Sequence, residues 1–188
     1  MATGSGQIMM RNDAGRVEPE SQQVRCAQVL GETEPGNGAR RKKVLAVSSG
    51  GGHWVQMMRL TSVLCAHDVV FATVNKAYGC DVPGAKVYAV VDATAWNKLK
   101  LLLQAIEVLL ILLRVRPDVV VSTGAAPGYF AIRLGKLLGA RTIWIDSIAN
   151  VERLSMSGAR IGEYADLWLT QWPHLALDSG PAYRGAVV

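Results

Sequence analysis

The sequence predicts an α/β protein built on a parallel sheet with helices on both faces. Short β-branched apolar runs alternate along the chain with longer helical stretches, as in repeated strand–helix units. The runs are continuously apolar rather than alternating, which is typical of strands buried on both faces. Half of the 188 residues are hydrophobic and only 19% are charged. This composition supplies one sizeable core and excludes a wholly disordered chain.

Six strands and four helices follow from this alternation. Gly and Pro mark the boundaries, because Pro favours a helix start and Gly a helix end. The stretch 75–85 contains both residue types and is expected to be a loop. The expected strands cover residues 44–48, 68–74, 86–91, 118–124, 141–146 and 166–171, and the expected helices cover residues 54–67, 96–114, 127–139 and 158–165.

The composition divides the chain into a tail and one domain. Residues 1–41 are rich in Gly, Gln, Arg and Glu and lack hydrophobic periodicity, so we expect a disordered tail without a signal peptide. The folded domain is expected over residues 42–188. No segment reaches the roughly 18–20 uninterrupted apolar residues of a membrane-spanning helix. The net charge of +5 suits lipid head groups or a phosphate-bearing substrate and is too small to indicate nucleic acid.

A glycine-rich turn joins the first strand to the first helix. Its sequence is Ser48-Ser49-Gly50-Gly51-Gly52-His53. At the carboxyl edge of a parallel sheet, such a turn lies where ligands bind, and the free amides of the next helix favour an anion. His53 could accept a proton from a substrate hydroxyl. A tight turn with a capping histidine explains the same residues, and both readings remain open.

The helix expected over residues 96–114 is apolar on nearly every side. One interpretation is a crossover helix buried against the sheet. A second is that its outer face lies in a membrane interface, with Trp96 at head-group depth and cations against anionic lipid. A third is that the outer face meets a protein partner. The candidate membrane-associating residues are Trp96, Lys98, Lys100, Leu109, Leu112, Arg114 and Arg116.

A polar segment follows the strand expected over residues 141–146. Asp146 ends this strand and is therefore expected at the ligand edge of the sheet. A structural role is equally open, because Asp146 can cap a turn and Ser155 or Ser157 can cap the next helix. Serine hydrolase chemistry is not indicated, since the chain has no G-x-S-x-G motif.

Several separated motifs together resemble one known family. SSGGGH with its helix, PDVVVSTGAAPG, and IDSIANVERLSMSGARIGEYADLWLTQWP are similar to the family of asparagine-linked-glycosylation protein fourteen and its PssD-type bacterial relatives. The resemblance covers about residues 42–188, in the family's order. A more distant similarity links the layout to the amino-terminal half of MurG-type GT-B glycosyltransferases.

This resemblance implies a Rossmann-like domain equivalent to the amino-terminal domain of a GT-B enzyme. It implies an inverting, UDP-sugar-dependent glycosyltransferase divided between two chains. This chain would bind a polyprenyl-diphosphate-linked acceptor at the cytoplasmic face of the membrane, as a peripheral protein. A small partner subunit would bind the UDP-sugar, which is a co-substrate; no cofactor and no metal are expected.

The resemblance also implies roles for individual residues. His53 is expected to be the catalytic base. The acceptor or its phosphates are expected to contact two short segments. The side chains that face the cleft or the partner are expected to follow the strand over 141–146. The expected catalytic residue is thus His53. The expected acceptor- or phosphate-binding residues are Ser49, Gly50, Gly51, Gly52, Ser122, Thr123 and Gly124. The residues expected to face the cleft or the partner are Asp146, Ser147, Asn150, Glu152 and Trp172.

Two alternative functions remain open from the sequence. The chain could be a non-catalytic scaffold that recruits and stabilises a glycosyltransferase subunit at the membrane. It could also be a stand-alone nucleotide-binding domain, but it carries neither G-x-G-x-x-G nor G-x-x-x-x-G-K-[ST]. The absence of these two motifs disfavours the nucleotide-binding alternative.

Overall fold

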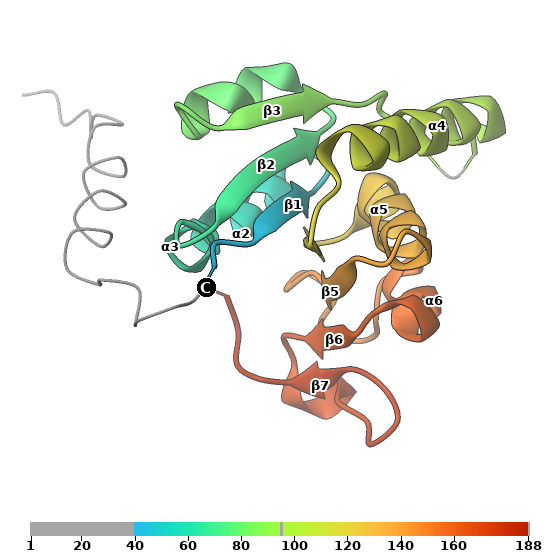
Figure 1. Cartoon of the computed structure of the whole chain (residues 1–188). Coiled ribbons are helices and arrows are strands. Elements are labelled where there is room, and N and C mark those ends of the chain that lie inside the picture. The colour runs from blue at the N-terminus through green and yellow to red at the C-terminus, as the bar shows by residue number, and fades with distance from the viewer. Residues whose placement is uncertain (1–39, 95, 188) are drawn as a thin grey trace, which may run out of the picture.

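Seven parallel strands form a single sheet in the computed structural model, which describes residues 40–94 and 96–187 (Figure 1). The strand order is β3-β2-β1-β4-β5-β6-β7. The strands are β1 (Lys43–Val47), β2 (Asp68–Thr73), β3 (Lys86–Ala89), β4 (Val119–Ser122), β5 (Arg141–Ile145), β6 (Leu167–Thr170) and β7 (Ala182–Tyr183). The helices are α2 (Gly52–Arg59), α3 (Thr61–Leu64), α4 (Lys98–Val115), α5 (Ala125–Leu137) and α6 (Gly158–Ile161), with 3₁₀ turns η1 (Lys76–Asp81), η2 (Gly162–Tyr164) and η3 (Pro173–Leu175).

Two hydrophobic cores lie on opposite faces of the sheet. Strand residues alternate between the faces, so β1 sends Leu45 and Val47 to one core and Val44 and Ala46 to the other. The first core lies under α4 and α5, and the second lies under α2. All four of these side chains are at most 2% exposed. Because both faces of the sheet are covered, the sequence of β1 is a continuous apolar run.

The order of the strands places a topological switch point between β1 and β4. From β1 the chain proceeds outward to β2 and β3, and then returns through α4 to β4 on the other side of β1. In folds of this class, the turns that follow the two strands at a switch point lead to opposite faces of the sheet, and ligands bind between them at the carboxyl edge. The turn before α2 and the turn before α5 therefore lie at this switch point.

The expected fold class is confirmed, and the six expected strands are all present. The structure adds β7, which has only two residues and no apolar run to mark it. The stretch 75–85, expected to be a loop, contains η1. The helix expected over 54–67 is divided at Leu60 into α2 and α3. The tail expected over residues 1–41 lies outside the described residues, except for its last two.

Candidate functional site

The two turns at the switch point are joined by a reciprocal pair of hydrogen bonds. Thr123 Oγ1 donates to the His53 carbonyl over 2.8 Å, and His53 Nδ1 lies 2.9 Å from the Thr123 carbonyl. Thr123 is fully buried, whereas His53 is half-buried. The structure thus brings together the glycine-rich turn and the segment Ser122–Gly124, as the sequence predicts.

The Thr123 carbonyl determines which nitrogen of His53 carries the proton. A carbonyl oxygen can only accept a hydrogen bond, so Nδ1 must be the protonated nitrogen. In the neutral ring Nε2 is then a hydrogen-bond acceptor. A ring oriented by one nitrogen, with the other available to take a proton, is the arrangement that a general base requires.

Gly124 leaves room for the His53 ring. A Cβ atom at position 124 would lie 2.7 Å from Cε1 and 2.8 Å from Nδ1 of that ring. The backbone of Gly124 also has φ of 128°, a conformation that side chains disfavour. Its amide donates to Ser122 Oγ over 3.1 Å, which anchors the start of α5.

Tyr78 covers the glycine-rich turn, and sequence reasoning missed this residue. The Gly51 amide donates to the Tyr78 hydroxyl over 3.0 Å. The Tyr78 ring stacks on Trp54 at 4.9 Å between centroids, with 14° between the planes. Trp54 Nε1 in turn donates to Asp81 over 2.7 Å. No signal in the Gly- and Pro-containing stretch 75–85 distinguished Tyr78 from a loop residue.

Asp146 lies at the expected edge but is enclosed in the protein. Its side chain is only 1% exposed. The carboxylate accepts hydrogen bonds from the Ser155 amide (2.9 Å), Ser155 Oγ (2.5 Å), Asn150 Nδ2 (3.2 Å) and Trp144 Nε1 (3.3 Å). Gln171 Nε2 binds its carbonyl over 2.8 Å. The geometry therefore gives Asp146 the turn-organising role that the sequence left as an alternative.

The other residues of the 147–157 segment differ in exposure. Ser147 is 9% exposed and accepts from the Ala149 amide, whereas Glu152 is exposed. Trp172 is half-buried, and its Nε1 donates to the Ile148 carbonyl over 2.8 Å. These contacts hold the segment against the end of β6. Among the side chains predicted to face the partner, Glu152 is the exposed one.

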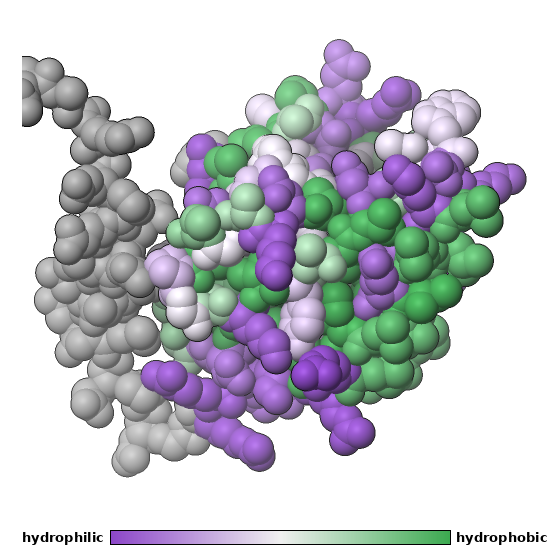
Figure 2. Space-filling model, turned by 90° about the horizontal axis from the view of Figure 1, so that it is seen from above, coloured by the Kyte–Doolittle hydropathy of each residue, from purple (hydrophilic) through white to green (hydrophobic). Residues whose placement is uncertain are grey.

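Helix α4 has two apolar faces with different environments. Its inner face packs into the core through Val108, Ile111, Leu112 and Val115. Its outer face forms a stripe of six exposed side chains at helical spacing, which Figure 2 shows as part of a continuous hydrophobic area. The stripe consists of Leu99 (82% exposed), Leu102 (60%), Leu103 (47%), Ile106 (47%), Leu110 (60%) and Leu113 (49%).

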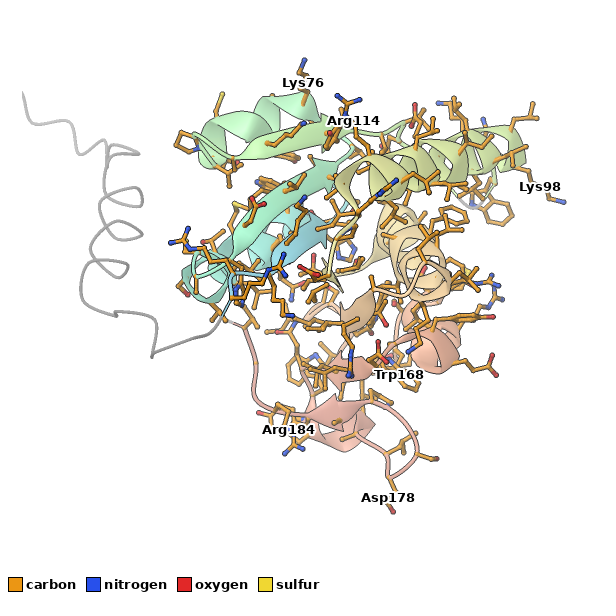
Figure 3. The ribbon with its side chains drawn as sticks, in the orientation of Figure 1. Lys76, Lys98, Arg114, Trp168, Asp178 and Arg184 are labelled. Atoms are coloured by element: carbon orange, nitrogen blue, oxygen red, sulfur yellow. The ribbon has the colours of Figure 1, made fainter. Side chains whose placement is uncertain are left out.

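The prediction that Leu112 faces outward is wrong. Leu112 is 1% exposed and lies in the core under α4, because it falls on the opposite side of the helix from the stripe. Leu109 is half-buried at the margin. Trp96 precedes the helix and is 95% exposed. Lys98 and Arg114 lie at opposite ends of α4 (Figure 3), and Lys100 and Arg116 are also exposed.

An open groove of about 630 Å³ lies away from the switch point. No predicted catalytic, binding or membrane residue lines it. The lining residues come from α5, α6, η2, β6 and the connection to β7, and they are Tyr129, Ala159, Arg160, Gly162, Glu163, Tyr164, Trp168 and Ser179.

The described residues contain neither a cluster of metal ligands nor a membrane-spanning helix. No three His, Cys, Asp or Glu side chains within residues 40–94 and 96–187 gather in a metal-binding arrangement. None of the helices in the same ranges has the length and apolarity needed to cross a membrane.

Among solved structures, the fold is similar to MurG of Acinetobacter baumannii. The TM-score is 0.64 at 14% identity, over 76% of this chain and 45% of that chain. It is also similar to UDP-N-acetylglucosamine 2-epimerase of Rickettsia bellii, with a TM-score of 0.60 at 14% identity, over 79% of this chain and 46% of the other. At such identity the likeness shows the fold, a Rossmann-like domain equivalent to the amino-terminal domain of a GT-B enzyme.

Curated relatives match a shorter part of the sequence. The chain is 37% identical over 67 residues to a protein of Yarrowia lipolytica named UDP-N-acetylglucosamine transferase subunit ALG14. It is 37% identical over 65 residues to the subunit of the same name in Schizosaccharomyces pombe. Each match spans 32% of this chain and 31% of the relative. The family described as oligosaccharide biosynthesis protein Alg14 like matches residues 85–187, more than half of the sequence. The chain therefore belongs to the Alg14 family.

Proposed function

We propose that this chain is the acceptor-binding, membrane-associating subunit of a two-component glycosyltransferase. A partner subunit binds a UDP-sugar, and the complex transfers the sugar with inversion to a polyprenyl-diphosphate-linked oligosaccharide. Family membership supports a role in oligosaccharide synthesis. The names of the yeast relatives, each a subunit of a UDP-N-acetylglucosamine transferase, support a divided enzyme and a UDP-sugar donor.

The observation that carries this proposal is the pair of joined turns at the switch point. The glycine-rich turn begins α2 without an acidic residue in its first turn, which favours a negatively charged group. Directly beside it, His53 is oriented by the Thr123 carbonyl and keeps Nε2 as an acceptor. A diphosphate-linked sugar at this edge would place its hydroxyl near a base.

In the proposed reaction His53 Nε2 takes the proton from the acceptor hydroxyl. The hydroxyl oxygen attacks the anomeric carbon of the UDP-sugar, the bond to the diphosphate breaks, and UDP leaves with the electron pair. Proton transfer to a positioned side chain contributes about 10²–10⁴-fold to such reactions. The partner subunit supplies the contacts to the UDP-sugar.

Membrane association is assigned to the outer face of α4. Isolated soluble proteins seldom expose a contiguous apolar area of this kind without a binding function. Here the six-residue stripe has Lys98 and Lys100 at one end and Arg114 and Arg116 at the other. A helix with an apolar outer face and cationic ends is suited to lie in the plane of an anionic membrane surface.

A co-expression assay tests the proposed enzyme. The full chain is produced alone and together with a candidate donor-binding subunit, and sugar transfer to a polyprenyl-diphosphate acceptor is measured. We expect transfer from the complex and little from the chain alone. Equal transfer by the isolated chain would refute the division of the enzyme between two subunits.

Liposome sedimentation tests the α4 face. Ile106→Glu with Leu110→Glu should release the chain from vesicles that contain anionic lipid, because both side chains are exposed on the stripe. The matched control is Val55→Glu with Val63→Glu, which adds the same charge at exposed valines on α2 and α3. Retention of both double variants on the vesicles would show that α4 does not bind the membrane.

A further inference from the structure

We propose that Tyr78 is a substrate-binding residue whose hydroxyl donates a hydrogen bond to a diphosphate oxygen of the acceptor. This inference rests on the proposed function, because it assigns the ligand of the glycine-rich turn. The Gly51 amide would otherwise be one of the donors that the start of α2 offers to an anion. In the structure this amide is already bound to the Tyr78 hydroxyl over 3.0 Å.

The hydroxyl of Tyr78 retains a free hydrogen. A phenol carries one O–H donor as well as acceptor lone pairs. The bond from Gly51 uses a lone pair, and the described residues offer the hydroxyl no other hydrogen-bond partner. The O–H is therefore available to an incoming oxygen. In a chain of hydrogen bonds from amide to hydroxyl to anion, each bond polarises the next. The bond from the Gly51 amide therefore makes the Tyr78 hydroxyl a stronger donor to the anion.

The position of the hydroxyl is fixed from both sides. The ring stacks on Trp54, a core residue that is 3% exposed, and Trp54 is held in turn by Asp81. A Cβ atom at Gly50 would lie 3.2 Å from the hydroxyl oxygen, so the turn and the phenol fit closely. A donor that is oriented before the ligand arrives loses little conformational entropy on binding.

Buried polar atoms near the turn support a polar ligand there. Ser48, the first residue after β1, is fully buried, and its Oγ has no hydrogen-bond partner. It follows Val44 and Ala46 in the alternation and therefore points to the α2 face of the sheet. Gln56, one helical turn beyond Gly52, is 3% exposed, and both its amide atoms are unpaired. Buried polar groups in native proteins normally have a partner, which a ligand or its waters would supply.

Tyr78→Phe removes the hydroxyl and keeps the ring on Trp54. The full chain is titrated with farnesyl diphosphate, and with farnesol as the ligand without phosphate, while tryptophan fluorescence is recorded. We expect affinity for farnesyl diphosphate to fall about tenfold, which is the loss of one charge-assisted hydrogen bond. The affinity for farnesol and the unfolding midpoint should not change. Tyr183→Phe, at an exposed tyrosine of β7, is the matched control.

Several results would overturn the inference. They are equal affinity of the wild-type and Tyr78→Phe chains for farnesyl diphosphate, no binding by the wild-type chain, and an equal loss of affinity for farnesol. If Tyr78→Phe instead lowers the unfolding midpoint, the affinity of the Gly50→Ala variant for farnesyl diphosphate tests the Tyr78 contact. This variant pushes the hydroxyl away by a few tenths of an ångström without removing it, and unchanged affinity would overturn the inference.

The titration and the sugar-transfer assay together separate this inference from the proposed function. If the wild-type chain binds farnesyl diphosphate through Tyr78 but the complex with its partner transfers no sugar, the proposed function fails and the Tyr78 contact stands. If the complex transfers sugar and Tyr78→Phe leaves the KM for the acceptor unchanged, the Tyr78 contact fails and the proposed function stands.

Discussion

Two loops at the same edge of the sheet differ in the exposure and hydrogen bonding of their polar groups. The glycine-rich turn leaves Gly51 and Gly52 exposed and His53 half-buried, with one ring nitrogen oriented by a carbonyl. The loop after β5 encloses the Asp146 carboxylate and satisfies it with donors from three residues. Position at the carboxyl edge is therefore not enough to assign function. The partners of a polar side chain distinguish a group that is available to a ligand from a group that holds the fold.

The largest expected effect concerns the glycine-rich turn. His53→Ala should reduce sugar transfer by the two-subunit complex by about 10²–10⁴-fold, because the variant loses the proposed base. Steady-state transfer assays at saturating acceptor measure this change. His174→Ala is the matched control, since His174 is an exposed histidine whose ring contacts Trp172 and whose Nε2 lies 2.6 Å from the Val151 carbonyl, at the edge of the other loop. Turnover that is unchanged in His53→Ala would place the chemistry in the partner subunit.

For the Asp146 loop, the expected effect is on stability. Asp146→Ala leaves the Ser155 amide and hydroxyl, Asn150 and Trp144 without their acceptor. The free energy of unfolding should fall by about 3 kcal/mol, as expected when buried donors lose a charged partner. Urea titration followed by circular dichroism measures it.

Glu152→Gln is the control for Asp146→Ala, because Glu152 is exposed in the same loop. If Asp146→Ala unfolds at the wild-type urea concentration and transfer is lost, then Asp146 acts in catalysis and the contrast between the two loops is wrong.

Gly124→Ala tests the fit between the two joined turns. The added Cβ would strain the backbone and displace the His53 ring, so we expect a loss of about 1–3 kcal/mol in stability and a lower kcat. Gly139→Ala is the matched control: its φ of 85° is also positive, but a Cβ there meets no atom within 4 Å. Equal losses of stability and equal turnover in the two variants would show that the His53 ring does not depend on Gly124.

The smallest expected effect lies at the opposite edge of the sheet. Asp166 accepts hydrogen bonds from Lys136 and from the Thr142 amide and hydroxyl. The Lys136 ammonium, followed by the Thr142 donors, lowers the pKa of Asp166 below its ordinary value of 3.8. A carboxylate with a lowered pKa stabilises the fold above its unfolded pKa, and this contribution is lost as the pH falls through the folded pKa.

Asp166→Asn should therefore have a lower free energy of unfolding than the wild type at pH 7, and this difference should disappear as acid protonates Asp166 below about pH 4. Because both partners are partly exposed, the difference should be about 0.5 kcal/mol. Thermal unfolding of the two proteins between neutral and acidic pH measures it. An identical pH dependence in both would show that this ion pair does not contribute.

The fold was largely predictable because its strands are buried on both faces. Such strands are apolar throughout, and the sequence predicts each of the six strands that are long enough to show this pattern. The strand β7 was missed since two residues at a sheet edge carry no periodicity. The 3₁₀ turn η1 was missed because its composition, with Gly and a nearby Pro, is also that of a loop. Local composition cannot separate these two states.

The candidate site was predictable in part. The glycine-rich turn and Ser122–Gly124 follow strands that are neighbours in the sheet, so their meeting follows from topology. Tyr78 could not be found in this way, because its contact with Gly51 depends on how η1 folds back over the turn. The burial of Leu112 was also missed. A helix that is apolar on both sides does not reveal which side meets the sheet until its rotation is known.

The close packing of His53 on Gly124 couples two positions that are 71 residues apart. A side chain at position 124 would occupy the volume of the imidazole, so neither residue can be replaced freely while the other stays. Among homologous sequences we expect these two sites to covary, with glycine retained wherever the histidine is present. Chimeras that exchange one of the two segments with a homologue that differs at both positions should lose function, and exchange of both segments together should restore it.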